Sequence, residues 1–376
     1  MKYILKSLNA ISFRGFAFCK EKIRHIFNEK PSTNILKSKL MKLSPEMDLI
    51  DRSFFLFKYI EFLNKKTIED DKIYKICLED INKVFDDMTK YSKVAIEYYI
   101  NLHKIHKFLP VNTSIENRLI INKLEGSLVT LIKSEDDRII RMLVLNASET
   151  GSALLFKSLN AELERYMKIF DASTVTLILY YLVKYKQKSQ IFSDKTNLNE
   201  ELYDYYLVKE RYKLLKPIDI SELIFILSEI PAINHKIDEL LVALISLINK
   251  NVRTYAHNIT VNQIFSSTIK IHSRNVLLYK ELYDSFITYI SSHISKYSIR
   301  TIAVILRTLN DFNYMADNLV LAAYKNVLKI EKISVIDGET LLATIPKIVS
   351  KDTLNTIEPL LKDISAKYKN SNSISD

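Results

Sequence analysis

The sequence predicts an all-α protein, an α-solenoid of about seven or eight degenerate two-helix repeats of roughly 40 residues each. Three observations indicate this fold class. The chain has 376 residues, 48% of them hydrophobic, but only four glycines, which disfavours folds rich in sheet turns or phosphate loops. One apolar pattern occurs four times between positions 219 and 351, and the steps between its copies are 41, 38 and 39 residues. A second helical run follows the first in every copy.

Each copy opens with a small or acidic residue and has apolar residues four and eleven positions later, as one face of a helix requires. The four openings are Asp219, Thr260, Ser298 and Asp337. A short polar break follows, and then a second apolar run. These second runs cover residues 237–248, 277–290, 315–328 and 354–364. Two helices per period are typical of a helical solenoid.

Residues 1–30 have the character of a targeting leader. Four basic residues precede the first acidic residue, Glu21, and the apolar residues among them have helix-like spacing. A basic, acid-poor, amphipathic start is typical of a mitochondrial or plastid transit peptide. The alternative is a basic first helix that stays on the protein. We therefore expect a mitochondrial protein, with a plastid as the other possibility.

Residues 31–216 predict further helical repeats with irregular spacing. The helical runs there are 47–63, 73–88, 94–108 and 115–132. Asp136 fits an N-cap, Gly151 breaks the helix that follows, and Asp171 begins another. The polar segment 187–202 suits a loop inside one repeat. Pro217 begins the regular repeats of residues 217–367, and the small polar residues 368–376 suit a frayed tail.

The composition excludes several protein classes. The two cysteines, Cys19 and Cys77, cannot form a disulfide framework and favour a reducing compartment. No apolar run approaches the roughly 20 residues that span a bilayer. Neither a phosphate-binding glycine loop nor a nucleophile elbow occurs, so the sequence predicts a binding protein that is not an enzyme and needs no cofactor.

The positive charge is concentrated in two stretches. Residues 1–30 hold seven Lys or Arg against two acids, and residues 250–307 hold eight against Glu281 and Asp284, while the whole chain has a formal charge of +10. The candidate RNA-binding residues in the second stretch are Lys250, Arg253, Lys270, Arg274, Lys280, Lys296, Arg300 and Arg307. If repeat ends stack along one edge, these cations line up to meet a phosphate backbone. The alternative is a solvated face, or a patch that meets an acidic protein neighbour.

Two other groups of residues have alternative interpretations. His103 and His106 could ligate a metal, but no further ligand stands at a suitable spacing, which favours a surface pair. A tyrosine cluster could stack on unpaired bases or fill a seam between repeats. It comprises Tyr180, Tyr181, Tyr185, Tyr203, Tyr205, Tyr206 and Tyr212.

Two units carry a family resemblance. They read DISELIFILSEIPAIN-HKIDELLVALISLINK and SIRTIAVILRTLNDFN-YMADNLVLAAYKNVLK. With the basic leader, they resemble the heptatricopeptide and octotricopeptide repeats of organellar proteins, which are related to repeats of the FAST-kinase-domain family. The resemblance covers roughly residues 47 to 365 and implies RNA binding in mitochondria or plastids. Such proteins often end in a RAP domain, but the residues after Ile348 lack its sheet character, and no recurring polar pair could read bases.

Two hypotheses of different classes follow. In the first, a mitochondrial helical-repeat protein contacts RNA phosphates through residues 250–307, as a subunit of an organellar ribosome or another ribonucleoprotein, beside protein subunits of that complex. In the second, a protein-only scaffold or assembly factor holds a partner chain in the groove of the solenoid. Steep salt dependence of binding distinguishes the first from the second.

Overall fold

The computed structural model shows an all-α fold. It describes residues 25, 35, 38, 49, 51–55, 72–88, 90–106, 111–186, 198–229, 235–271, 276–328 and 333–372. Every regular element in these ranges is a helix, and no strand occurs among them, so the all-α prediction is confirmed. Within the same ranges, no helix combines the length and the apolar character that crossing a bilayer requires. The predicted leader, residues 1–30, lies outside the described residues apart from position 25.

The chain divides into two compact units, Met1–Arg165 and Tyr166–Asp376. We call them unit 1 and unit 2. The division therefore falls before Pro217, where the regular sequence pattern begins. It lies within helix α10 (Leu163–Ile169).

Unit 1 contains five helices that pack on one another in sequence order among the residues described there. They are α5 (Lys72–Asp86), α6 (Ser92–Ile105), α7 (Val111–Leu131), α8 (Asp137–Thr150) and α9 (Ala153–Ala161). Asp136 caps α8 by accepting a hydrogen bond from the Arg138 amide at 3.0 Å, as the sequence predicts. Gly151 ends the helix at φ 72°, a left-handed conformation that glycine adopts without strain. The carboxylate of Glu125 on α7 accepts from the hydroxyls of Tyr99 on α6 and Ser152 before α9, and so ties three helices together.

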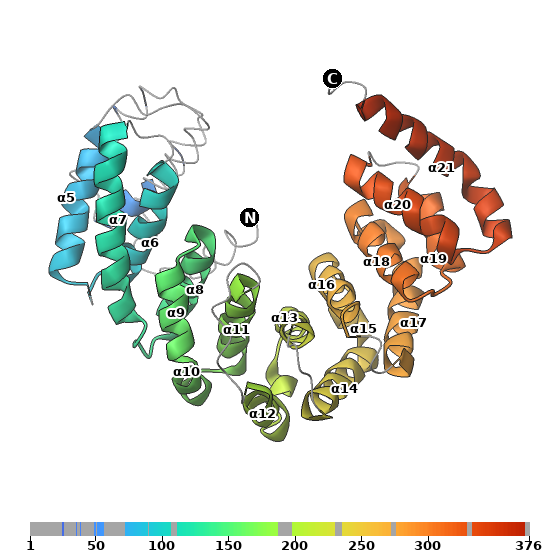
Figure 1. Ribbon diagram of the computed structural model, residues 1–376, viewed down its shortest axis with the longest axis horizontal. Helices are drawn as coiled ribbons and strands as arrows, with labels where there is room; N and C mark the ends of the chain where they lie inside the picture. Colours follow the sequence, from blue (N-terminus) through green and yellow to red (C-terminus); the bar gives the residue numbers. More distant parts are fainter. Residues whose placement is uncertain are drawn as a thin grey trace. The chain divides into compact units, whose positions relative to one another are not determined.

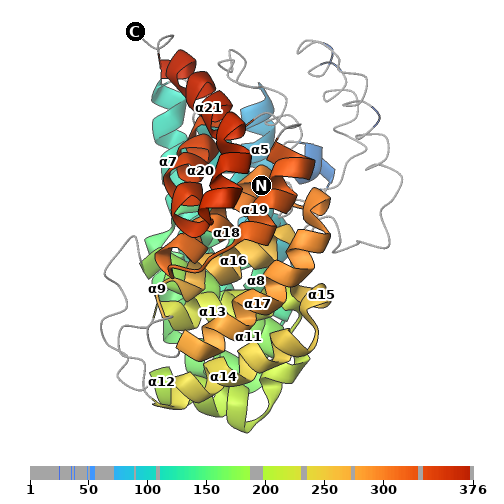
Figure 2. The ribbon, with the colours of Figure 1, turned by 90° about the vertical axis from the view of Figure 1, so that its right-hand side faces the viewer.

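Unit 2 arranges its helices in two rows, which Figure 1 shows as an inner and an outer row of the unit. The first row consists of α11 (Ala172–Lys186), α13 (Pro217–Ser228), α16 (Asn258–Thr268), α18 (Ile299–Asp311) and α20 (Val335–Ile348). Each packs on the next, and Figure 2 shows them stacked one above another. Local signals begin these helices: Pro217 starts α13, and the hydroxyls of Ser298 and Ser334 cap α18 and α20.

The second row lies against the first. It consists of α12 (Leu198–Leu202) with the π-helix η3 (Tyr203–Val208), α14 (His235–Lys250), α17 (Val276–Ser292), α19 (Asp317–Ala323) with the π-helix η7 (Tyr324–Leu328), and α21 (Lys351–Asn372). The second runs predicted from the sequence correspond to α14, α17, α19 with η7, and α21. Of the predicted loop 187–202, residues 198–202 are helical and 187–197 lie outside the described residues. Of the predicted tail, α21 includes residues 368–372, and 373–376 lie outside the description.

The first-row helices share one burial register, which corrects the sequence alignment in the third copy. Asp219, Thr260 and Asp337 are buried near the starts of their helices, and the residue that matches them in α18 is Thr301, which is fully buried. Ser298 is instead the exposed N-cap of α18. A serine before a helix resembles the small or acidic openings of the other copies in sequence. Burial places the equivalent position three residues later.

Candidate nucleic-acid interface

The first-row helices run in parallel, so their beginnings lie along one edge of unit 2 and their ends along the other. Lys270, just after α16, forms an ion pair with Glu229 at the end of α13. At the opposite edge, the Ser298 amide before α18 donates to Asn258 Oδ1 at the start of α16, at 3.0 Å. α14 has 16 residues and is therefore about 24 Å long, so its C-terminal Lys250 lies far from the edge where it begins.

Turns that lead from the second row back to the first form the edge where the first-row helices begin. They contain the 3₁₀-helix η4 (Arg211–Leu214), the short helix α15 (Val252–Tyr255), the 3₁₀-helix η6 (Ile294–Lys296) and the π-helix η7. In Figure 2, α15 protrudes at one side of the stack. α15 packs on α17, and η6 packs on η7, so the last three turns form a continuous surface.

Specific hydrogen bonds hold these turns in place. Arg211 donates to the Met167 carbonyl at 3.3 Å, and its guanidinium lies over the Tyr205 ring. The Tyr297 hydroxyl donates to the Ala256 carbonyl at 2.8 Å. Burial raises the pKa of Tyr297 to about 12, so this hydroxyl remains a hydrogen-bond donor at neutral pH. The amide of Asn258 donates to the Lys296 carbonyl and joins two successive turns.

Cations predominate on this surface, which we call the basic edge and define as residues 208–216, 250–257, 292–298 and 324–328. Its eight basic residues are Lys209, Arg211, Lys213, Lys216, Lys250, Arg253, Lys296 and Lys325. All of them are exposed except Arg211, which is half-buried. The basic edge contains one carboxylate, Glu210, which pairs with Lys213 at 2.6 Å. Asp219 and Asp337 lie nearby at helix starts but are buried. The N-termini of α13, α16, α18 and α20 add partial positive charge at the same edge.

The opposite edge has no such excess. Lys270 is paired there with Glu229. The other cations of that edge, Lys236, Lys280, Arg307, Lys347 and Lys351, are accompanied by Asp238, Glu239, Glu281, Asp311, Asp317 and Asp352. A hydrogen bond from the Thr353 side chain, followed by bonds from the hydroxyl and amide of Ser350, holds the pKa of the Asp317 carboxyl below its ordinary range. Positive charge is therefore in excess on the basic edge, whereas the two signs are roughly balanced on the opposite edge.

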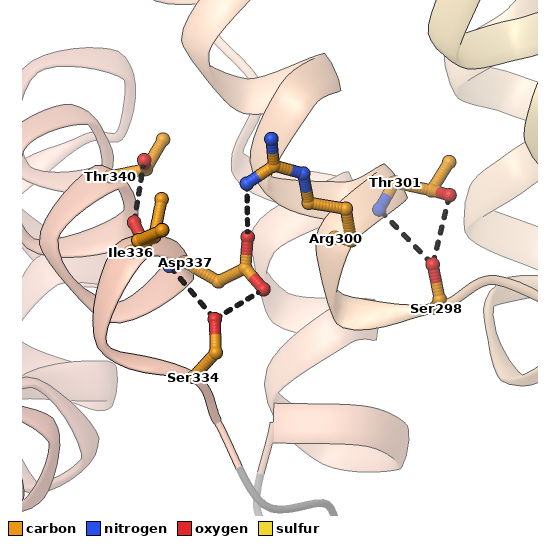
Figure 3. A network of polar contacts seen from close by, with 7 residues as sticks. All are labelled: Ser298, Arg300, Thr301, Ser334, Ile336, Asp337 and Thr340. Atoms are coloured by element: carbon orange, nitrogen blue, oxygen red, sulfur yellow. Dashed lines mark hydrogen bonds and ion pairs between the residues drawn. The ribbon is translucent and has the colours of Figure 1, made fainter. Parts of the chain in front are cut away.

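The eight residues predicted from the sequence do not form a single row. Lys250, Arg253 and Lys296 lie on the basic edge. Arg300 begins α18 beside that edge but forms an ion pair with Asp337 (Figure 3). Lys270 and Arg307 lie towards the C-terminal ends of first-row helices, and Lys280 lies in the first turns of α17. Arg274 lies outside the described residues.

The cations do not share one edge, because some follow the end of a second-row helix and others follow the end of a first-row helix. The two rows run in opposite directions, so Lys250 and Lys270 lie at opposite edges. Sequence reasoning also missed Lys209, Arg211, Lys213, Lys216 and Lys325. The signal was present in the position of each cation within its repeat, which a charge sum over one contiguous window does not reveal.

Most of the tyrosine cluster fills seams between helices. The Tyr180 ring packs edge-on against Phe225 of the next first-row helix, with centroids 5.2 Å apart. Tyr206 is fully buried, and its hydroxyl lies 2.7 Å from that of Thr176. The Tyr203 hydroxyl donates to Glu239 on α14. Of the two interpretations, the structure therefore favours the seam for these tyrosines.

The histidine pair in unit 1 is engaged with neighbouring side chains. The His106 ring lies within hydrogen-bond distance of Ser114 and Asn117, and the His103 ring packs edge-on against Tyr99. Burial lowers the pKa of His103. Within the described residues, no cluster of three or more His, Cys, Asp or Glu could hold a metal ion.

No protein-family model matches the chain, and no curated protein matches it either. The geometry of unit 2 and the chemistry of its residues therefore carry the functional argument.

Proposed function

We propose that this protein is a mitochondrial α-solenoid of about seven or eight two-helix repeats that binds RNA phosphates through the basic edge, as a subunit of an organellar ribonucleoprotein. The two rows of unit 2 support the solenoid, because the described first-row helices pack on one another in chain order, α11 on α13, α13 on α16, α16 on α18 and α18 on α20. The basic leader of residues 1–30 supports the mitochondrial location.

The excess of positive charge on the basic edge carries the RNA proposal. Eight cations and one carboxylate line four successive turns, whereas the cations of the opposite edge are accompanied by a similar number of carboxylates, Lys270 with Glu229 among them. Binding of cations to phosphates is driven by the release of counterions and needs no base-reading side chain. The C-terminal ends of second-row helices stabilise cations such as Lys250 and Lys325, but the N-termini of first-row helices at the same edge oppose that effect.

A second feature of the edge fits a protein neighbour in the same complex. Ile218, Ile259 and Ile336 occupy the same position on α13, α16 and α20, and they are 37%, 46% and 63% exposed. Aliphatic side chains gain nothing from phosphate contact but are stabilised when another protein covers them. We therefore propose that a protein subunit covers this row beside the RNA. Replacing the three isoleucines with serine should release that subunit and leave RNA binding unchanged.

Two triple variants with the same change of charge test the RNA proposal. The first, Lys250→Glu with Arg253→Glu and Lys296→Glu, reverses the basic edge. The second, Lys280→Glu with Arg307→Glu and Lys347→Glu, reverses exposed cations elsewhere on unit 2. Both are made in the full chain, and circular dichroism checks that each is folded. The probe is a fluorescent RNA hairpin of about 12 base pairs.

We expect the first triple to weaken binding at least about tenfold at low salt and to reduce its salt dependence, because phosphate contacts are lost. The second triple should bind within about threefold of the parent, since its net charge changes equally but its cations are not on the basic edge. Equal losses in the two triples would show a general charge effect and contradict the proposal. No loss in either would contradict it as well.

A further inference from the structure

The aromatic side chains of the basic edge are mostly unavailable for stacking on bases. Tyr255 and Tyr297 are 6% and 3% exposed, and Tyr205, just before the first turn, is 2% exposed. The hydroxyls of Tyr205 and Tyr297 donate to the carbonyls of Phe170 and Ala256, which fixes both rings in place. Exposed aromatic rings are what proteins use to hold the unpaired bases of a single strand.

The half-buried aromatic rings near this edge are also poorly available for stacking on bases. Tyr289 is stacked on His293, with ring centroids 4.3 Å apart, and Tyr212 lies on the first turn with Lys213 over its ring. Tyr324 is also half-buried and has interactions within the protein. The large exposed side chains of the edge are mostly charged; Val208 and Leu214 are aliphatic, and His257 is an exposed ring that is smaller than a tyrosine ring.

The spacing of the cations suits a rigid ligand. Neighbouring packed helices are about 8–10 Å apart, so the four turns from η4 to η7 place cations along roughly 25–30 Å. A single strand would have to be ordered over that length without stacking to compensate for its lost freedom. A double helix is already ordered and presents phosphates of both strands at high density.

We propose that the basic edge binds RNA as a double helix, by its phosphates and shape, and not as unpaired bases. This inference rests on the proposed function and names the form of RNA that the site accepts. It implies that binding is largely insensitive to base sequence, because contacts to phosphates and to the shape of a duplex carry little sequence information.

The test compares a mixed-sequence RNA duplex of about 16 base pairs with each of its separated, unstructured strands, using the full chain at low salt. We expect the duplex to bind at least about tenfold more tightly than either strand, and a duplex of scrambled sequence to bind equally well. Lys250→Glu with Arg253→Glu and Lys296→Glu should weaken duplex binding. Tyr212→Ala should change neither affinity by more than about twofold, whereas a stacking tyrosine would contribute about fivefold or more.

The outcomes separate this inference from the proposed function. Equal or tighter binding of a single strand, or a marked loss with Tyr212→Ala, would overturn the duplex inference while leaving RNA binding at the edge in place. Failure of both the duplex and the strands to bind would overturn the proposed function, and the inference with it.

Discussion

Arg300, in the first turn of α18, donates a hydrogen bond from Nη1 to Oδ1 of Asp337, in the first turn of α20, at 3.0 Å (Figure 3). The other carboxylate oxygen of Asp337 accepts a hydrogen bond from the Ser334 hydroxyl at 2.7 Å, and that hydroxyl in turn accepts from the Asp337 amide. The pair joins two successive first-row helices. It also engages a cation that the sequence alone assigned to RNA.

The two members of this pair should contribute unequally to stability. The Arg300 side chain is 62% exposed and that of Asp337 is 12% exposed. Removing an exposed partner of an ion pair changes the free energy of unfolding by about 0–1 kcal/mol, whereas removing a buried residue that secures a helix cap costs about 1–2 kcal/mol. We therefore expect Asp337→Ala to destabilise the protein more than Arg300→Ala in urea unfolding. Lys347→Ala, an exposed change on the same helix, is the control, and equal effects of the pair would contradict this assignment.

Replacing two glycines of unit 1 with alanine should change the stability of the protein in opposite directions. Gly151 has φ 72°, and Gly126 lies inside α7, while neither has an atom within 4 Å of an added Cβ. Gly151→Ala should cost about 1–2 kcal/mol, because the left-handed conformation is strained for alanine even in open space. Gly126→Ala should stabilise by about 0.5–1 kcal/mol, because alanine restricts the unfolded chain and favours the helix. Thermal and urea unfolding measure both, and a shift of the same sign in the two variants would contradict the backbone assignment.

Removing the buried hydroxyls of Thr176 and Tyr206 should destabilise the protein by unequal amounts. Thr176 donates to the Ala172 carbonyl at 2.7 Å, so the Tyr206 hydroxyl is the donor in the 2.7 Å contact between them. Tyr206→Phe leaves the Thr176 proton satisfied and should cost about 1 kcal/mol. Thr176→Val leaves a fully buried tyrosine hydroxyl without its acceptor and should cost about 1–3 kcal/mol. Urea unfolding of the two single variants and the double variant measures their coupling, and additive effects would show that the two hydroxyls do not interact.

Asp80 should give the stability of unit 1 a pH dependence. Burial raises the pKa of this carboxyl above its ordinary 3.8, although Tyr98 donates to it at 2.8 Å and Arg52 lies 3.3 Å away. The folded chain therefore retains the proton at a pH where the unfolded chain has lost it. The stability that this proton contributes is present below pH 3.8 and is lost as the pH rises through the folded pKa.

Substitution tests the sign of this effect. Asp80→Asn should flatten the fall in unfolding free energy with rising pH, whatever its effect on absolute stability, because asparagine does not titrate. Tyr98→Phe should steepen the fall, because the hydrogen bond to the carboxylate is removed. Urea unfolding across the acid range measures the slopes. Parallel curves for Asp80→Asn and the parent would show that Asp80 does not contribute.

Local signals in the sequence were sufficient to predict the presence of helices and several of their ends. Asp136 caps α8, Gly151 ends it and Pro217 begins α13, because capping and backbone preference act within one turn of a helix. The apolar spacing that follows Asp219 likewise indicates a helix, since the 3.6-residue period is a property of the segment alone. The register of α18 was beyond this reasoning, because Ser298 and Thr301 are similar in sequence and only packing buries Thr301.

By itself, then, the sequence determined that this chain is helical, where several of its helices begin or end, and how much positive charge it carries. Only the tertiary structure decided which cations are neighbours. Lys250 and Lys270 lie 20 positions apart in the chain but at opposite edges, whereas Asn258 and Ser298 are in contact across 40 positions. The physical reason is that the helices of the two rows run in opposite directions, so the position of a charge within its repeat, and not its distance along the chain, determines the surface on which it lies.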